Sequence, residues 1–287
     1  MPQQPEDLLN GSIKLTSLPE VCVRVNEMVD DPHSSAADIG EVISRDPALT
    51  AQLLRIANSS FFNFPSKIAT VSRAITIIGE RELRYLVLAM SAIRSFSDVP
   101  LDTINMATFW RHSVYTGVMA RLLAKRCRVL HSERLFVTGL LHEVGLLLLL
   151  TGEAEREANA MSVSGERGIA LSVAEEQEFG FNHADVGRAL LTSWNLPPEL
   201  CEAVGCAHDI EGATLAPLDV AIVHVADILA NQAEMSSDCS GVCVDYGEGV
   251  WDMLGLDPSI TAELTEQAEP LFAESWALIQ PMVRHAR

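Results

Sequence analysis

The sequence has few basic residues for its length. Its 287 residues include 20 Lys and Arg against 39 Asp and Glu, which gives a net charge of −19. Nucleic-acid affinity depends mainly on cationic side chains that contact phosphates, and anionic membranes attract the same groups. The charge balance therefore argues against direct DNA or RNA binding and against an anionic membrane as a partner.

Long apolar runs and a leader sequence are also missing. The longest apolar stretches, such as residues 85–90 and 144–150, are far shorter than the roughly 20 residues that cross a bilayer as a helix. The N-terminal residues do not combine a basic region with an apolar one, as a signal peptide would. We therefore expect a cytoplasmic protein that does not span a membrane.

The cysteines follow no recognisable pattern. There are six of them and no CxxC pair, and a chain of this length does not need disulfides to fold. We expect most of them to be buried thiols. Cys239 and Cys243 lie close together in a polar stretch, but nothing else there favours a disulfide or a metal site.

Helical spacing of apolar residues covers most of the chain, and strand-like alternation is scarce. Asp46-Pro47 places a capping side chain before a proline that suits the first turn of a helix. A boundary is expected at residues 97–100, which end in a proline. The sequence therefore predicts an all-α, two-lobed helical bundle, with an N-terminal lobe over residues 1–100, a second lobe over 101–232 and a C-terminal helical extension over 233–287. The acidic stretch 153–178 is expected to be a surface connection with one short helix.

Two helices around Gly79 have the outline of a helix-turn-helix. The second of them is largely apolar over residues 83–90. A recognition helix must present polar side chains to base edges. An ordinary helical hairpin packed in a core is therefore favoured over a DNA-binding motif.

The second lobe places ionisable residues among apolar ones. His112 lies in an apolar helix, His142 and Glu143 interrupt an apolar run, and Asp227 continues an apolar stripe. A buried charged carboxylate costs several kcal/mol unless it is paired or binds a metal. Imidazole and carboxylate together are suitable ligands for zinc, iron or manganese. These four residues are therefore candidate metal ligands, and a metal-free hydrogen-bonded network of the same residues stays open.

For the other polar residues of this lobe the sequence gives weaker reasons to expect a ligand role. His183 begins an apolar helix and His208 continues an apolar stripe. His224 lies one turn before Asp227, where we expect it to hold a ligand in place rather than to bind metal. Ordinary solvated or capping roles are expected for Asp185, Asp209, His33, His131 and His285.

At these residues the sequence resembles the HDOD family, whose fold is similar to that of the HD phosphohydrolases. The motifs in the second lobe are Trp110-Arg111-His112-Ser113, Leu140-Leu141-His142-Glu143-Val144-Gly145, His183-Ala184-Asp185-Val186-Gly187, Trp194-Asn195-Leu196-Pro197 and Ala226-Asp227. The first lobe adds Ile43-Ser44-Arg45-Asp46-Pro47, Leu54-Arg55-Ile56-Ala57-Asn58-Ser59 and Ala74-Ile75-Thr76-Ile77-Ile78-Gly79. The resemblance covers residues 15 to 230 of the chain, and several motifs in the same order make it specific.

The resemblance implies a metal site with one departure. Enzymes of the wider HD superfamily hold metal on a His, a His-Asp pair and a distant Asp, which correspond here to His112, His142 with Glu143, and Asp227. One extra methylene at Glu143 moves the carboxylate by roughly 1.5 Å, whereas metal–ligand distances are held within about 0.2 Å. Two bridged metals are therefore disfavoured, and a single iron, manganese or zinc ion stays open.

The chain is also similar to the HD-GYP phosphodiesterases, with further departures. His183 and His208 match additional histidines of those enzymes, so they are candidates for a second metal site or a ligand site. Asp209 stands where a second His is expected, Leu146 stands where a Lys is expected, and no Gly-Tyr-Pro signature is present. A phosphodiesterase needs activated water and a charge clamp on the phosphate, and no basic clamp is evident.

The resemblance therefore implies a bacterial signal-transduction output domain with no catalytic residues of its own. Such domains often belong to two-component response regulators, and this one would bind a signalling protein or a nucleotide-type small ligand. The alternative is a metal-dependent phosphohydrolase that acts on a nucleotide or a cyclic dinucleotide. The chain itself shows no βαβ pattern of a receiver domain.

Overall fold

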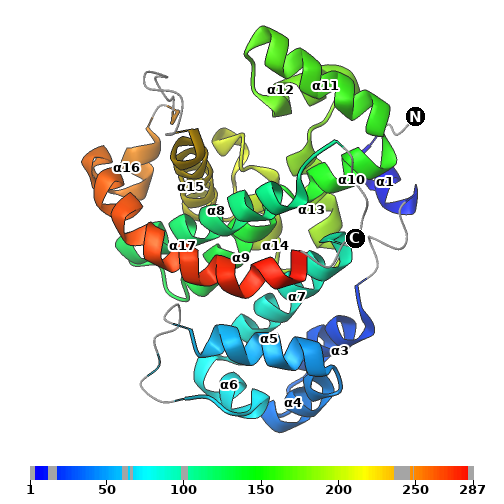
Figure 1. Cartoon of the computed structure of the whole chain (residues 1–287), viewed down its shortest axis with the longest axis vertical. Helices are drawn as coiled ribbons and strands as arrows, with labels where there is room; N and C mark the ends of the chain where they lie inside the picture. Colours follow the sequence, from blue (N-terminus) through cyan, green and yellow to red (C-terminus); the bar gives the residue numbers. More distant parts are fainter. Residues whose placement is uncertain are drawn as a thin grey trace. The chain divides into compact units, whose positions relative to one another are not determined.

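The structure of the protein is a computed structural model (Figure 1). It describes residues 4–11, 18–59, 64, 67–97, 103–235, 246–247 and 249–283. Helices form all the regular secondary structure of these residues. The predicted all-α fold is therefore confirmed.

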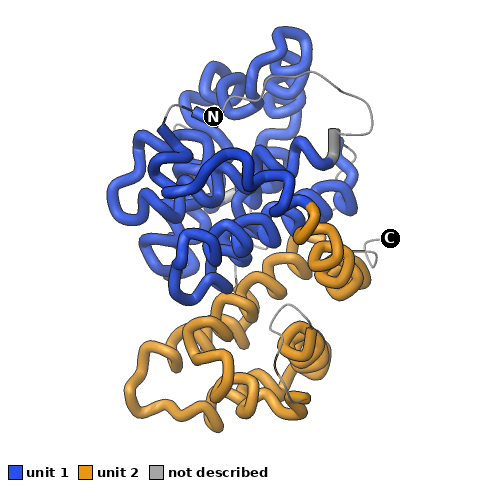
Figure 2. Tube along the Cα trace, turned by 90° about the vertical axis from the view of Figure 1, so that its left-hand side faces the viewer, with its two compact units in different colours: residues 1–17, 100–265 blue, residues 18–99, 266–287 orange. Residues whose placement is uncertain are grey.

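The chain divides into two compact units, drawn in two colours in Figure 2. Unit 1 contains residues 1–17 and 100–265, and unit 2 contains residues 18–99 and 266–287. One division lies beside Pro100, but the two terminal segments are grouped differently from the predicted lobes. The assignment of separate functional domains at residues 100 and 232 stays a prediction.

Unit 2 consists of short helices packed around aliphatic side chains. They are α3 (Glu20–Asp30), α4 (Ala36–Ser44), α5 (Pro47–Ala57), α6 (Val71–Ile78), α7 (Glu80–Ser97) and the later part of α17 (Thr261–Val283). The start of α5 is as predicted, because the Asp46 side chain accepts a hydrogen bond from the Leu49 amide and Pro47 occupies the first turn. Gly79 separates α6 from α7 with a φ of 106°, which few other residues adopt.

Helix α7 is a core helix. Every residue from Leu83 to Ile93 is buried, including Arg84, which forms an ion pair with Asp30 at 3.0 Å. No continuous polar face is left for reading base edges. The expected core hairpin is therefore confirmed, and the helix-turn-helix alternative fails.

Unit 1 is built around the long helix α8. Its helices are α1 (Pro5–Gly11), α8 (Met106–Arg126), α9 (Glu133–Leu141), α10 (Val144–Gly152), α11 (Ala154–Arg167), α12 (Leu171–Phe179), α13 (His183–Ser193), α14 (Pro198–Gly205), α15 (Pro217–Met235), α16 (Val250–Leu254) and the start of α17, with 3-10 turns at Ile210–Gly212 and Pro258–Ile260. Helix α8 packs against α9 and α15, while α13 packs against α10 and α14 (Figure 1). These contacts bring the predicted site residues into one region.

The expectation for residues 153–178 is wrong. Instead of a surface connection with one short helix, this segment forms α11 and α12, which pack against each other. Glu157 and Glu175 are completely buried there. The acidic composition concealed a polar interior face, because most of the other acids of the segment face solvent.

One described segment is long and apolar enough to cross a membrane. It is Glu133–Gly152, and 83% of its most apolar window is buried inside the protein. That burial is typical of a core segment, and it comes from α9 and α10 packing within unit 1.

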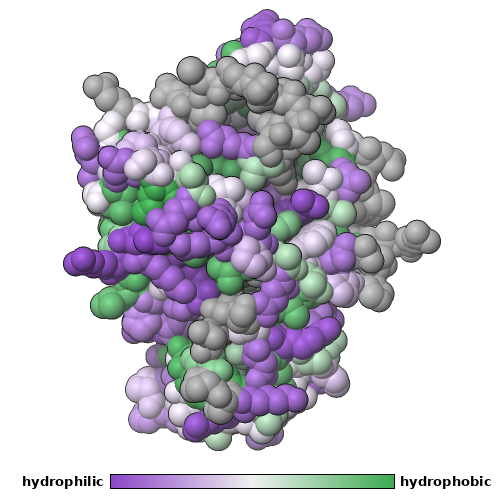
Figure 3. All heavy atoms as spheres, turned by 60° about the vertical axis from the view of Figure 1, so that its left-hand side comes forward, coloured by the Kyte–Doolittle hydropathy of each residue, from purple (hydrophilic) through white to green (hydrophobic). Residues whose placement is uncertain are grey.

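Cys22, Cys201 and Cys206 are buried free thiols, as expected, while Cys127 is partly buried. Cys239 and Cys243 lie outside the described residues. On the face shown in Figure 3, hydrophilic residues predominate and hydrophobic ones form small separate patches.

Candidate functional site

Three parts of unit 1 bring four predicted ligands together. His112 lies in the middle of α8 and Asp227 lies in α15, while His142 and Glu143 form the junction between α9 and α10. One ligand atom from each of the four residues lies within 4.8 Å of the others. His112, His142 and Asp227 are buried, and the side chain of Glu143 is 22% exposed. The cluster is therefore enclosed on most sides and reachable through Glu143.

Glycines allow the two histidine-bearing segments to approach closely. A Cβ atom on Gly139 would lie 2.8 Å from the Cα of Gly117, and one on Gly117 would lie 2.6 Å from the carbonyl oxygen of Phe136. Only hydrogen fits at both positions, so α8 and α9 pack backbone against backbone. His142 follows Gly139 by three residues, so this contact places it beside His112, with 5.4 Å between the ring centroids.

The ring of His142 is held in one orientation. Its Nδ1 atom lies 2.7 Å from the carbonyl oxygen of Gly139, so this nitrogen carries the proton and donates it. The Nε2 atom is then the ring nitrogen that faces the carboxylates. It lies 3.4 Å from Oδ1 of Asp227 and 4.0 Å from Oε1 of Glu143. This buried atom has no hydrogen-bond partner among the described residues.

Asp227 stays ionised although it is buried. Burial opposes its ionisation, but the hydrogen bond from His112 Nε2 at 3.0 Å and the nearby His142 outweigh it and hold the pKa of Asp227 well below its usual value. The same Oδ1 atom accepts a 3.0 Å hydrogen bond from Asn231. Glu143 behaves similarly, because the charges of His112 and His142 lower its pKa despite burial. The site therefore contains two carboxylates that favour a bound cation.

Two polar contacts fix the start of α15, the helix that carries Asp227. Arg134 of α9 donates to both carboxylate oxygens of Asp219. Glu202 of α14 accepts hydrogen bonds from three consecutive backbone amides, those of residues 214, 215 and 216, at 2.8, 2.8 and 2.6 Å. These amides precede the helix and would otherwise lack partners. The position of Asp227 thus depends on two neighbouring helices.

His183 and His208 form a second pair beside this cluster. Their Nε2 atoms are 2.8 Å apart. His183 is the first residue of α13, where Asn182 and Asp185 form a capping box, so the expected capping role of Asp185 is confirmed. His208 does not continue a helix as expected, because α14 ends at Gly205. A Cβ on Gly145 would lie 2.0 Å from the carbonyl oxygen of His183, so the start of α10 packs directly on the start of α13.

The His183–His208 pair has a defined proton distribution. Glu175 accepts hydrogen bonds from both the backbone amide and Nδ1 of His183, at 2.8 and 2.7 Å. Burial disfavours a charged His183, but Glu175 outweighs it and raises its pKa to about 9. Burial and the charge of His183 lower the pKa of His208 to about 4. His183 is thus the donor and His208 the acceptor, while the use of either as a second-site metal ligand stays a prediction.

Glu157 and Glu175 are the site residues that the sequence analysis missed. Burial and the neighbouring Glu175 raise the pKa of Glu157 to about 8, so Glu157 is protonated at neutral pH and can donate to Glu175. A weak signal was present: Glu157 with Ala160, and Glu175 with Phe179, are pairs at helical spacing that share a buried face. The result is a chain of polar groups from Glu157 through Glu175 and His183 to His208.

The remaining predicted residues lie elsewhere. His224 places Nδ1 2.7 Å from the carbonyl oxygen of Ala207 and Nε2 3.2 Å from that of Tyr246, so it contacts the loop that carries His208 rather than the four-residue cluster. Asp209, His33 and His131 are exposed, and His285 lies outside the described residues.

Comparison with known proteins identifies the fold family. The HDOD domain family matches residues 15–210, which is more than half of the chain. The chain belongs to the HDOD family. An uncharacterized protein from Treponema pallidum (strain Nichols) is 26% identical over 201 residues, covering 69% of this chain. The match spans only 38% of that longer protein.

Solved structures agree with the HDOD fold. An HDOD domain protein of unknown function from Geobacter sulfurreducens aligns with a TM-score of 0.70 at 23% identity, covering 93% of this chain and 92% of that one. A protein from Shewanella amazonensis, provisionally named a phosphohydrolase, aligns with a TM-score of 0.72 at 23% identity over 96% and 97% of the two chains. A protein from Marinobacter aquaeolei, provisionally named a signal transduction protein, aligns with a TM-score of 0.72 at 20% identity, covering 99% of this chain and 62% of that one. At these identities the likeness concerns the fold.

The charges that act on Glu143 come from neighbouring histidines and one carboxylate. The largest charge effects on Glu143 come from His112, His142, Asp227 and His183, and no lysine or arginine is among them. Leu146, which stands where HD-GYP enzymes carry a Lys, is buried and apolar. The arrangement suits a cation, and the positive charges among the main ones that act on Glu143 come from histidines.

Proposed function

We propose that this HDOD protein is a regulatory signalling domain that binds one divalent metal ion at His112, His142, Glu143 and Asp227 and does not hydrolyse phosphate esters. The observation that carries the proposal is the buried Nε2 atom of His142. It has no hydrogen-bond partner among the described residues, and it faces Oδ1 of the ionised Asp227.

The donor set fits a metal ion. Two imidazoles and two carboxylates are a ligand combination that zinc, iron and manganese accept. The hydrogen bond from Nδ1 of His142 to Gly139 orients the ring and leaves Nε2 as the nitrogen that can bind an ion. A cation here would also offset the charges of Glu143 and Asp227. When bound, such an ion can act as a Lewis acid and lower the pKa of a bound water.

The surroundings favour regulation over hydrolysis. Phosphoester hydrolysis needs positive groups that stabilise the charge developing on the phosphate. The positive groups among the main charges that act on Glu143 are histidines, with no lysine or arginine among them. His183 and His208 are hydrogen-bonded to each other and are not free to serve as independent acid and base. A metal would instead tie α8, the α9–α10 junction and α15 together, so its presence could alter the stability of unit 1.

A regulatory domain of this kind would act in the bacterial cytoplasm, in two-component signalling, through a protein partner or a nucleotide-type ligand. The name of the Marinobacter neighbour, a signal transduction protein, is in keeping with that proposal. The name of the Shewanella neighbour, a phosphohydrolase, makes hydrolysis the alternative that an experiment must test.

Metal content gives the first test. The full chain is purified without chelators, and its metals are measured by mass spectrometry and located by anomalous scattering in crystals. Wild type and the exposed-histidine control His33→Ala should contain about one ion per chain. His142→Ala and Asp227→Asn should lose it. A wild-type protein that takes up no zinc, iron or manganese contradicts the metal site.

Turnover gives the second test. Metal-loaded wild type is incubated with cyclic dinucleotides and with nucleoside phosphates, beside His142→Ala treated identically. We expect no hydrolysis above the level of the variant. Turnover that disappears in His142→Ala would overturn the regulatory proposal and establish the hydrolase alternative, with the metal site intact.

A further inference from the structure

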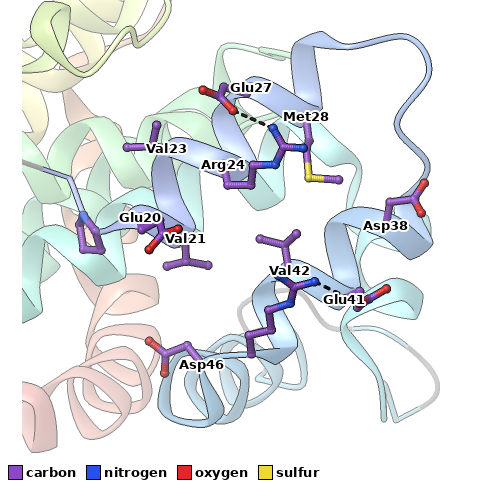
Figure 4. A pocket seen from close by; sticks show the side chains of 12 residues that line it. Glu20, Val21, Val23, Arg24, Glu27, Met28, Asp38, Glu41, Val42 and Asp46 are labelled. Atoms are coloured by element: carbon purple, nitrogen blue, oxygen red, sulfur yellow. Dashed lines mark hydrogen bonds and ion pairs between the residues drawn. The ribbon is translucent and has the colours of Figure 1, made fainter.

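A groove runs between α3 and α4 in unit 2 (Figure 4). Its volume is about 750 Å³. Apolar side chains from both helices line it, among them Val21 and Met28 of α3 and Val42 of α4. Val23, at the edge, is 43% exposed, which is unusual for a large aliphatic residue. Met28 is buried, whereas Val21 and Val42 are only partly buried, so the groove offers apolar surface that unit 2 leaves partly exposed.

The rim of the groove is acidic. Five carboxylates line it, those of Glu20, Glu27, Asp38, Glu41 and Asp46, against two guanidinium groups.

Most of the charged rim residues already have partners. Arg24 pairs with Glu27 at 2.9 Å and Arg45 pairs with Glu41 at 3.1 Å, so each arginine is neutralised on its own helix. Within the described part of the chain, no ion pair includes Glu20, so its charge is left at the rim. Asp46 pairs with Arg94 at 2.9 Å, so among the described residues the uncompensated negative charge that borders the apolar surface is that of Glu20 and Asp38.

We propose that this groove binds a short amphipathic helix of a partner protein, with aliphatic residues on one face and lysines or arginines beside them. The aliphatic residues would enter between α3 and α4, and the cations would lie against the acidic rim. A helix is the expected form because the described chain has no strand edge to which an extended peptide could add. The stems of Arg24 and Arg45 extend the apolar walls.

Charge also decides against other occupants. A second copy of this chain carries the same net charge of −19 and would bring like charge to the rim. A nucleic acid is excluded on the same ground. A basic partner segment is the occupant whose charge complements the site.

This docking surface names a partner class for the proposed regulatory role and to that extent rests on it. It does not involve the metal ligands, which all lie in unit 1. Loss of peptide binding and loss of metal binding are therefore separate results, and either proposal can fail alone.

Fluorescence anisotropy of the full chain tests the proposal with defined probes. The first is a labelled synthetic peptide of about 18 residues, long enough to form a helix on binding. It has leucines at i, i+3, i+4 and i+7 spacing and lysines elsewhere. The second places glutamates at the lysine positions, and the third has the first peptide's composition with the leucine spacing scrambled. We expect the first to bind at least tenfold more tightly than the other two. Equal binding of the first and third would overturn the proposal.

Matched variants separate the groove from general charge attraction. Glu20→Lys with Glu41→Lys reverses two rim charges, and Val42→Ser reduces the apolar wall. The control is Glu155→Lys with Glu211→Lys, two exposed acids of unit 1 that give the same change in net charge. We expect at least tenfold weaker binding in both groove variants and less than threefold in the control. Equal weakening in the control and the double groove variant would overturn the proposal.

Methyl chemical shifts locate the bound peptide independently of any variant. The proposal expects the first peptide to shift the methyl signals of Val21, Val23, Met28 and Val42 in otherwise unchanged wild-type protein. Shifts confined to methyls outside the groove would contradict it. This measurement decides the case even if a groove variant folds poorly, which circular dichroism would reveal.

Discussion

Nε2 of His142 and Oδ1 of Asp227 face each other at 3.4 Å, and this Nε2 atom has no hydrogen-bond partner among the described residues. The proton of the His142 ring is on Nδ1, where Gly139 accepts it, and the pKa of Asp227 is well below its usual value. A buried polar atom without a hydrogen bond is costly, and a cation bound between the ring nitrogen and the carboxylate would give both atoms a partner. This relationship makes the site's behaviour toward metal measurable.

Metal should stabilise the wild-type protein and leave a ligand variant unchanged. Adding manganese or zinc to chelator-treated protein at about 100 times its Kd is expected to raise the free energy of unfolding by about 2.7 kcal/mol. His142→Ala should show no such increase, because it removes the nitrogen that faces Asp227. Thermal unfolding followed by circular dichroism measures both. A similar increase in His142→Ala would mean that the ions bind elsewhere.

Glu157→Gln should change how stability depends on pH. The pKa of Glu157 is raised from 4.5 to about 8 in the folded protein. Below pH 4.5 Glu157 is protonated in both the folded and the unfolded protein. Between pH 4.5 and 8 only the folded protein keeps this proton, so the contribution of Glu157 to the free energy of unfolding decreases as the pH rises. Above pH 8 it is lost completely. Relative to Glu157→Gln, wild type should lose about 1 to 3 kcal/mol across this range.

Urea unfolding at several pH values measures that difference. Glu155→Gln, on an exposed position of the same helix, is the matched control and should follow wild type. If the difference between wild type and Glu157→Gln stays constant from pH 5 to 8, Glu157 does not hold its proton in the folded state.

Gly145→Ala should destabilise the protein and weaken metal binding. The added Cβ would lie 2.0 Å from the carbonyl oxygen of His183, so α10 and α13 would have to separate. We expect a loss of about 2 to 4 kcal/mol. Metal affinity should fall as well, because Glu143 lies two residues before the contact. Unfolding and metal titration are the measurements.

Gly165→Ala is the control for that substitution. Gly165 lies within α11, and nothing lies within 4 Å of a Cβ placed there. Alanine should stabilise the helix by about 0.5 to 1 kcal/mol. Equal effects of the two substitutions would contradict the close packing at Gly145.

Glu202→Gln should destabilise unit 1 by about 1 to 3 kcal/mol at neutral pH, because the amides of residues 214–216 lose a charged acceptor. Burial opposes ionisation of Glu202, but these hydrogen bonds outweigh it and lower its pKa. The stabilisation by Glu202 is therefore fully present above the pKa that this carboxyl has in the unfolded chain. It is lost as the pH falls through the lower pKa of the folded protein. Glu199→Gln, an exposed acid on the same helix, should have little effect. Denaturant unfolding at neutral and acidic pH compares the two variants.

Local rules predicted the helices well. The helix start at Asp46 and the helix end at Gly79 follow from side-chain and backbone preferences of single residues. They can therefore be predicted without knowing which segments pack against them. The burial of α7 followed from its apolar composition alone. Residues 153–178 were misjudged for the same reason, since composition does not say which acid on an amphipathic helix faces inward.

The sequence predicted only some residues of the candidate site. The four residues of the metal cluster stood out because each is an ionisable group among apolar ones. The family resemblance implied that they form one site, but the distances of up to 4.8 Å between their ligand atoms depend on how closely helices α8, α9 and α15 pack. Glu157 and Glu175 were missed because their only signal is a helical spacing from one apolar residue each, which is weak in an acidic segment.

The sequence by itself determined the all-α class, the HDOD resemblance and the identity of the candidate ligands, because these depend on residue type and on spacing along one helix. Only the tertiary structure decided that Nε2 of His142 faces Asp227, that Glu175 holds a charged His183, and that His224 contacts a loop instead of the cluster. Distances between residues far apart in the chain are set by packing, such as the backbone contact of Gly117 with Gly139. Electrostatic effects depend on those distances and on burial, so the protonation of the site was decided by the fold.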